Sequence, residues 1–166
     1  DDGLHEHTFL DQQRVSDSPY GTNRHYWKGL FVRALPDEAI DAMFERVTAF
    51  HRPPCHILIE SLHGAPKDSD PGIGVAGFRN AAFNVSAMAV WKQQEHDGEC
   101  IAWARGTAQA IEPWSSNTGG YVNYMQSDEP IERVRATFGA ASFERLQALK
   151  SRFDPNNVLT PGAGIF

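Results

Sequence analysis

Apolar residues recur along the chain in two spacings, one typical of strands and the other of helices. Aromatic and β-branched runs predict strands at residues 26–34, 56–62, 75–78, 83–91 and 121–125. Apolar residues three and four positions apart predict helices at residues 37–50, 99–111, 128–139 and 142–153. This order predicts an α+β fold: a mainly antiparallel sheet with helices packed on one face, plus a C-terminal helical segment.

The helices carry more specific expectations about their faces and ends. Five apolar residues of the first helix should share one face that packs on the rest of the protein: Ile40, Met43, Phe44, Val47 and Phe50. In the C-terminal third, Asp128 and Ser142 are expected to cap two short amphipathic helices, the first of which ends at Gly139.

The predicted strand at 83–91 has two different sides. Its odd-numbered positions are all apolar, whereas the opposite side begins with the polar residues Asn84 and Ser86. Because side chains alternate across a strand, the apolar side is expected in the core. One side of this strand is thus expected to be packed, and the other begins polar.

Length and charge narrow the class of protein. A chain of 166 residues has room for one domain, and its net charge of −6 argues against nucleic acid and anionic membrane surfaces as partners. No charge-free run approaches the ~20 apolar residues of a membrane span. A small-molecule ligand fits better. The start at Asp1 and the polar, aperiodic residues 1–25 predict an irregular N-terminal stretch in a piece of a longer protein.

The motifs of metal, hydrolytic and phosphate-binding sites do not occur. Seven histidines are scattered without an HExxH motif or cysteine partners, so no metal site is expected. Cys55 and Cys100 lie in no nucleophile context, and no serine occupies a GxSxG elbow. Gly72 and Gly74 lack the spacing of a P-loop and indicate a turn between strands.

The segment Gly119-Gly120-Tyr121-Val122-Asn123-Tyr124 is the strongest candidate for chemistry. Paired glycines allow close approach to a ligand, and a strand would place Tyr121 and Asn123 on the same side. A phenol beside an amide could combine proton transfer with hydrogen bonding, provided that a cationic or electrophilic neighbour favours the phenolate. The residues alone fit an ordinary tyrosine-rich strand equally well.

Several of these segments, in their shared order, resemble the C-terminal half of the berberine bridge enzyme-like FAD-linked oxidoreductases. The most specific are YVNY at 121–124 and ERLQALKSRFDPNN at 144–157. The weaker ones are YWKGLF at 26–31, the helix beginning at Pro36, IESLHGA at 59–65, GFR at 77–79, the strand ending at Trp91 and Phe138-Gly139.

The resemblance implies a flavoprotein whose FAD is held mainly by an N-terminal domain that this sequence lacks. It divides the chain into the N-terminal stretch 1–25, a substrate-binding α+β domain at 26–120, and a berberine-type segment at 121–166 that would return to the missing flavin domain. The expected partners are that FAD-binding domain and a small-molecule substrate, with no nucleic acid and no membrane. The chain is expected to be inactive by itself.

The resemblance also implies roles for single residues. Tyr121 matches the position that often acts as catalytic base, and Asn123 and Tyr124 match positions on the flavin side. Asn84 and Ser86 match positions lining the substrate pocket, although the residues alone fit ordinary solvated strand positions equally well. Relatives commonly carry larger polar or acidic side chains where this chain has Ser86, which puts a carboxylate-assisted mechanism in doubt. The ending at residues 159–162 also departs from the Asn-rich tail of many relatives.

Two functions follow from these observations. The first is the substrate-binding portion of an FAD-dependent oxidoreductase that oxidises a hydroxyl-bearing small molecule by hydride transfer to flavin. The second is a stand-alone binding or interaction module with the same α+β fold and no catalysis.

Overall fold

The structure is a computed structural model that describes residues 6–14, 23–50, 54–64, 68, 77–116 and 119–159. Gly72 and Gly74, residues 75–76 of a predicted strand and residues 160–162 of the C-terminal ending lie outside the described residues.

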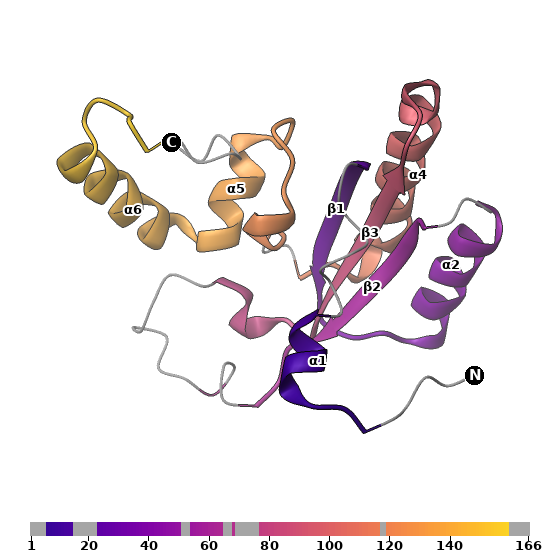
Figure 1. The fold of residues 1–166 in the computed structure, drawn as a ribbon. Coiled ribbons are helices and arrows are strands. Elements are labelled where there is room, and N and C mark those ends of the chain that lie inside the picture. The colour runs from indigo at the N-terminus through magenta and orange to yellow at the C-terminus, as the bar shows by residue number, and fades with distance from the viewer. Residues whose placement is uncertain are drawn as a thin grey trace.

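A three-stranded antiparallel sheet forms the centre of the fold, in the order β1-β3-β2 (Figure 1). Its strands are β1 (Arg24–Val32), β2 (His56–Ser61) and β3 (Phe83–Trp91). The register pairs Asn84 of β3 with Glu60 of β2 and with Phe31 of β1. The predicted strands at 26–34, 56–62 and 83–91 are thereby confirmed to within two residues.

Two helices, α2 (Asp37–Thr48) and α4 (Asp97–Ile111), cover one face of the sheet (Figure 1). Two clusters of buried residues fill the space between this face and the helices. The first contains Trp91 of β3 with Trp103 of α4, and the second contains Val85 of β3 with Met43 of α2 and Ile111 of α4. The odd-numbered side of β3 thus lies in the core, and the α+β fold with helices on one face is confirmed.

The buried face of α2 is rotated from the predicted one. Ala39 and Met43 are buried, whereas Ile40, Phe44 and Val47 are 47%, 68% and 40% exposed. The interface with α4 accounts for the rotation, because Arg46 of α2 reaches across it and donates to the Trp103 carbonyl and the Thr107 hydroxyl, at 3.3 Å each.

The C-terminal helical segment consists of α5 (Ile131–Phe138) and α6 (Ala140–Phe153), which lie on the other side of the sheet from α2 and α4 (Figure 1). Neither predicted cap occurs. Pro130 precedes α5 and Gly139 precedes α6, and the Asp128 carboxylate binds Tyr26 and Arg105 instead of the helix terminus.

Three further segments differ from the sequence-based expectations. Phe9–Arg14 forms a short helix, α1, in the stretch predicted to be irregular, and Thr8 and Asp11 exchange the hydrogen bonds of a capping box at its start. Gly77–Asn80, within and after the strand predicted at 75–78, forms the 3-10 turn η1. Val122–Tyr124 forms the 3-10 turn η4, so the strand predicted at 121–125 is wrong.

The edge of β1 explains why residues 121–125 do not form a strand. Ser115 forms a bridge to Val32, and the Ser116 amide donates to the Phe31 carbonyl at 2.8 Å, so preceding residues already occupy this edge. Arg133 of α5 donates to the next outward carbonyl, that of Gly29. The chain therefore leaves the edge before Tyr121 and turns onto the sheet face opposite α2 and α4.

Candidate functional site

A cavity of about 230 Å³ lies on this opposite face of the sheet. Phe31, Glu60 and Asn84 line it from the strands, and Leu62, Phe78 and Tyr121 line it from the segments that follow β2, precede β3 and precede η4. The structure therefore brings two of the sequence-predicted residues, Tyr121 and Asn84, to one cavity from positions 37 residues apart in the chain.

Tyr121 lies at the rim of this cavity, immediately before η4. Its ring is half-buried, and the Asn123 side-chain amide donates to its hydroxyl at 2.8 Å. Tyr121 and Asn123 therefore lie together as expected, but a 3-10 turn and not a strand brings them together. Because the amide occupies an acceptor position of the phenol oxygen, the phenol's own hydrogen remains available to a ligand.

The cation that would favour a Tyr121 phenolate does not come from the described part of this chain. No ion pair or hydrogen bond there joins a cationic side chain to the Tyr121 hydroxyl. The ionisable group at the cavity wall is instead the Glu60 carboxylate.

Tyr124 connects the turn to the sheet. Its ring meets Tyr121 edge-on with centroids 4.9 Å apart and meets Trp27 of β1 edge-on at 5.4 Å. Its hydroxyl donates to Glu60 Oε1 at 3.3 Å. These contacts hold Tyr124 against the sheet, whereas Asn123 is exposed.

Glu60 is the site residue that sequence reasoning missed. It lies directly across from Asn84 in the β2–β3 pairing, and Asn84 Nδ2 donates to Glu60 Oε2 at 2.7 Å. Asn84 is only 2% exposed, and its amide oxygen has no hydrogen-bond partner among the described residues. The available signal was a single acidic residue in the mostly apolar segment HILIESL.

Ser86 occupies a different environment from Asn84. It is completely buried, does not line the cavity, and lies opposite Gly29 of β1. A Cβ at Gly29 would lie 2.5 Å from Ser86 Oγ, so the Ser86 hydroxyl fills the space that a side chain at Gly29 would need.

Gly119 and Gly120 allow the backbone to pass close to α5 and β1. Gly119 has a φ of +75°, and its Cβ would lie 2.7 Å from the Arg133 carbonyl oxygen. A Cβ at Gly120 would lie 2.6 Å from the Gly29 carbonyl oxygen. The close approach that the paired glycines permit is therefore to α5 and β1.

Two acidic residues anchor the segment between η4 and α5 to β1. Asp128 accepts hydrogen bonds from Tyr26 and Arg105, and Glu129 forms ion pairs with Lys28 at 2.6 Å and Arg133 at 3.2 Å. Burial raises the pKa of Asp128, but the hydrogen bonds from Arg105 and Tyr26 outweigh it, so the pKa lies below its usual value. Burial also raises the pKa of Tyr26. We call Asp128 and Glu129 together the acidic anchor.

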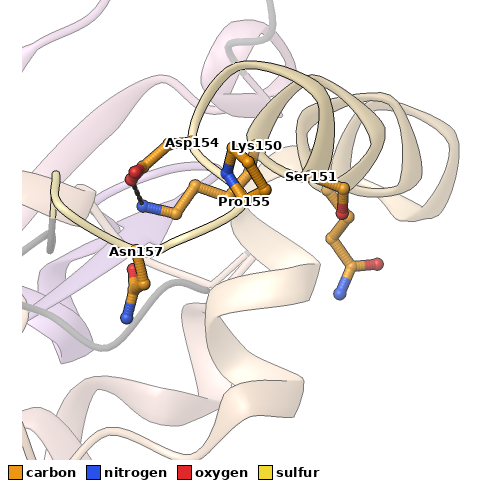
Figure 2. A pocket seen from close by; sticks show the side chains of 6 residues that line it. Lys150, Ser151, Asp154, Pro155 and Asn157 are labelled. Atoms are coloured by element: carbon orange, nitrogen blue, oxygen red, sulfur yellow. Dashed lines mark hydrogen bonds and ion pairs between the residues drawn. The ribbon is translucent and has the colours of Figure 1, made fainter.

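A second hollow, of about 410 Å³, lies at the C-terminal end of α6, where the FDPNN motif begins (Figure 2). Its charged groups bind one another: Lys150 donates to the Asp154 carboxylate, which also accepts the backbone amides of Val158 and Leu159 at 2.7 and 2.9 Å. The Lys150 hydrogen bond and these amides lower the pKa of Asp154. In the described residues this motif shapes a turn, so the first cavity is the better candidate site.

The described residues contain neither a metal-binding cluster nor a membrane-spanning helix. No group of three or more histidine, cysteine or acidic side chains there could hold a metal ion. None of the helices in the described ranges is long and apolar enough to span a bilayer.

Known proteins match this chain in sequence and in fold. The family model described as "Berberine and berberine like" matches residues 120–165. The FAD-linked oxidoreductase aurO of Gibberella zeae is 30% identical over 105 residues, which cover 63% of this chain and 20% of that protein.

Solved structures show the same fold at lower identity. Wild-type BBE-like 1 of Physcomitrella patens is 21% identical with a TM-score of 0.74, covering 93% of this chain and 33% of that one. Berberine bridge enzyme of Eschscholzia californica is 20% identical with a TM-score of 0.75, covering 94% and 35%. The chain thus spans about a fifth to a third of the length of the proteins it matches.

Proposed function

We propose that this chain, which is related in sequence and fold to the berberine bridge enzyme-like FAD-linked oxidoreductases, forms the substrate-binding wall of an enzyme that oxidises a hydroxyl-bearing small molecule. One observation carries the proposal: Tyr121, Asn84 and Glu60 line a single cavity beside an aromatic wall. A phenol, an amide and a carboxylate can together orient a hydroxyl group.

The rim of the cavity supports a site shared with other polypeptide. Tyr121 is half-buried and Asn123 is exposed, so neither is sealed in the interior. The cavity of about 230 Å³ is below the ~300–1,000 Å³ typical of pockets for drug-sized ligands, so it is too small to hold FAD by itself. Asn123 and Tyr124 could only flank a cofactor held elsewhere.

The proposed role of Tyr121 is to accept the proton of the substrate hydroxyl. When bound, FAD supplies the acceptor for the hydride that leaves the adjacent carbon. Asn123 keeps the phenol oxygen oriented through its 2.8 Å hydrogen bond, and Asn84 and Glu60 hold the substrate. The positive or electrophilic neighbour that this role requires would come from the flavin side, because the described residues of this chain do not supply it.

The domain division is part of the same proposal. Residues 26–120 would form the substrate-binding domain, and residues 121–166 would return to an FAD-binding domain outside this sequence. Exposed apolar residues at the end of α6 and directly after it support this division. Phe153, Val158 and Leu159 are 70%, 78% and 74% exposed. Apolar side chains exposed to this degree in one segment are typical of a surface that packs against further polypeptide. By itself the chain would then lack activity.

The test uses the flavin-loaded full-length protein. Tyr121→Phe removes the phenol oxygen and should slow anaerobic flavin reduction by the substrate roughly 100-fold or more. Thr48→Ala removes a remote hydroxyl on α2 and should leave the rate unchanged. An unchanged rate in Tyr121→Phe would exclude Tyr121 as the base. A colourless full-length preparation that cannot be reconstituted with FAD would favour the stand-alone binding module.

A further inference from the structure

We infer that Glu60 makes the cavity selective for charge, so that it takes ligands bearing hydroxyl or ammonium donors on an aromatic or apolar body and rejects carboxylates and phosphates. The inference rests on the proposed function, whose substrate class it narrows.

Glu60 carries a negative charge that no cation in the described part of the chain neutralises. Its oxygens accept from two neutral groups, the Asn84 amide at 2.7 Å and the Tyr124 hydroxyl at 3.3 Å. The acidic anchor and Asp97 differ, because each of those carboxylates pairs with an arginine or a lysine. An unpaired carboxylate at a half-buried wall favours a ligand that brings positive charge or hydrogen-bond donors.

The cavity also offers more acceptors than donors. Each carboxylate oxygen has two lone pairs, so each oxygen of Glu60 retains one after the contacts with Asn84 and Tyr124. The amide oxygen of Asn84 also has no partner among the residues described, but the atom is buried, so the acceptors open to a ligand are those of Glu60. A ligand hydroxyl or ammonium group would satisfy these acceptors, whereas a carboxylate would meet them with lone pairs of its own.

The remaining walls fit a flat apolar body. The rings of Phe31 and Phe78 lie with centroids 5.7 Å apart, and Leu62 completes this side. Among the described residues, none that lines the cavity is cationic, so these walls carry no positive charge that would compensate an anionic ligand. The cavity thus combines an apolar floor with an anionic wall at Glu60.

Three probes of the same ring size separate charge from shape: benzyl alcohol, benzylammonium and benzoate. We would titrate each into the full-length protein and follow backbone amide signals by NMR, with Glu60, Asn84 and Tyr121 as reporters of the cavity. Benzyl alcohol and benzylammonium should shift these signals and bind at least about tenfold more tightly than benzoate, a ratio equivalent to ~1.4 kcal/mol.

Two variants test whether Glu60 causes the preference. Glu60→Gln keeps the size and an acceptor oxygen but removes the charge, so benzylammonium should lose its advantage over benzoate. Glu144→Gln removes an exposed carboxylate on α6 and should leave the order of the probes unchanged.

Three results would overturn the inference: benzoate binding the wild-type chain as tightly as benzylammonium, an unaltered preference in Glu60→Gln, or no shift at the cavity with any probe. The wild-type comparison needs no variant, so it holds even if Glu60→Gln fails to fold. Failure of the proposed function is distinguishable, because the probe order can hold in a protein that never reduces flavin.

Discussion

Asn84 and Glu60 face each other across β3 and β2, and the buried Asn84 amide donates to the Glu60 carboxylate at 2.7 Å. The amide is a neutral donor, so it supports the Glu60 carboxylate, which pairs with no cation among the described residues, without cancelling its charge. This hydrogen bond therefore links a buried residue of the central strand β3 to the carboxylate at the cavity wall.

Replacing this amide with a carboxylate should destabilise the fold in a pH-dependent way. In Asn84→Asp two carboxylates would share one site, so at pH 7 the free energy of unfolding should fall by roughly 1–3 kcal/mol. The loss should shrink toward pH 5, because protonation of one carboxyl relieves the repulsion and restores a donor. Urea denaturation at both pH values measures the change.

Asn123→Asp is the matched control, since Asn123 is exposed. Its free energy of unfolding should change by no more than about 0.5 kcal/mol. Equal losses in both variants, or no pH dependence in Asn84→Asp, would contradict the described pairing.

The acidic anchor should contribute more to stability than an exposed ion pair of the same chain. The Glu129 side chain is 2% exposed and pairs with Lys28 and Arg133, whereas Glu144 is 67% exposed and pairs with Arg135. Glu129→Gln leaves two cations without their anion and should lower the free energy of unfolding by roughly 3 kcal/mol. Glu144→Gln should change it by less than about 0.5 kcal/mol.

Thermal or urea denaturation of the two variants makes this comparison. A spectroscopic readout separates local from global effects, because Glu129→Gln should also alter the near-ultraviolet circular dichroism of the Trp27–Tyr124 contact before unfolding. Identical stabilities of the two variants would show that Glu129 does not anchor this segment.

The sequence predicted the sheet because its strands have strong local patterns, in particular the alternation along β3. It failed at residues 121–125, where the apolar and aromatic composition fits a strand but the edge of β1 is already occupied by Ser115 and Ser116. Occupation of an edge is a tertiary property that no local pattern carries. The expected pairing of Tyr121 with Asn123 nevertheless occurs, through a 3-10 turn.

The site shows the same division between local and long-range information. Tyr121 could be selected from its motif and Asn84 from the family resemblance, but Glu60 acquires its place only through the register that sets it opposite Asn84. The caps predicted at Asp128 and Ser142 failed for a related reason. Asp128 has long-range partners in Tyr26 and Arg105, and these outcompete the local helix terminus.

Gly119 should be far less tolerant of substitution than Gly64, although both have positive φ angles. Gly64 has a φ of +73° and no atom of the described residues within 4 Å of its missing Cβ, so Gly64→Ala should cost only the backbone strain of about 1–2 kcal/mol. Gly119→Ala adds contacts of 2.7 Å with the Arg133 carbonyl oxygen and 2.9 Å with the Thr137 amide, and should cost roughly 2 kcal/mol more. Denaturation midpoints of the two variants give the difference, and equal costs would contradict the described packing of α5.

Acid should loosen the protein through three aspartates whose pKa values the fold lowers. A hydrogen bond from Arg24 lowers the pKa of Asp97, Lys150 lowers that of Asp154, and Arg105 with Tyr26 lowers that of Asp128 against the opposing effect of burial. The unfolded chain, with an aspartate pKa of about 3.9, therefore takes up these protons first. The stabilisation is fully present above about pH 5 and is lost as the pH falls through the folded pKa values.

Denaturation midpoints measured between pH 6 and pH 3 should accordingly decline below about pH 5. Asp128→Asn removes both the carboxylate that pairs with Arg105 and its titration. The variant's midpoint should therefore be lower than that of the wild type at pH 6, and it should decline less steeply toward pH 3. Glu38→Gln, at the exposed start of α2, should retain the wild-type slope. A wild-type slope in Asp128→Asn would show that Asp128 gains nothing from Arg105 and Tyr26, and that the acidic anchor depends on Glu129 alone.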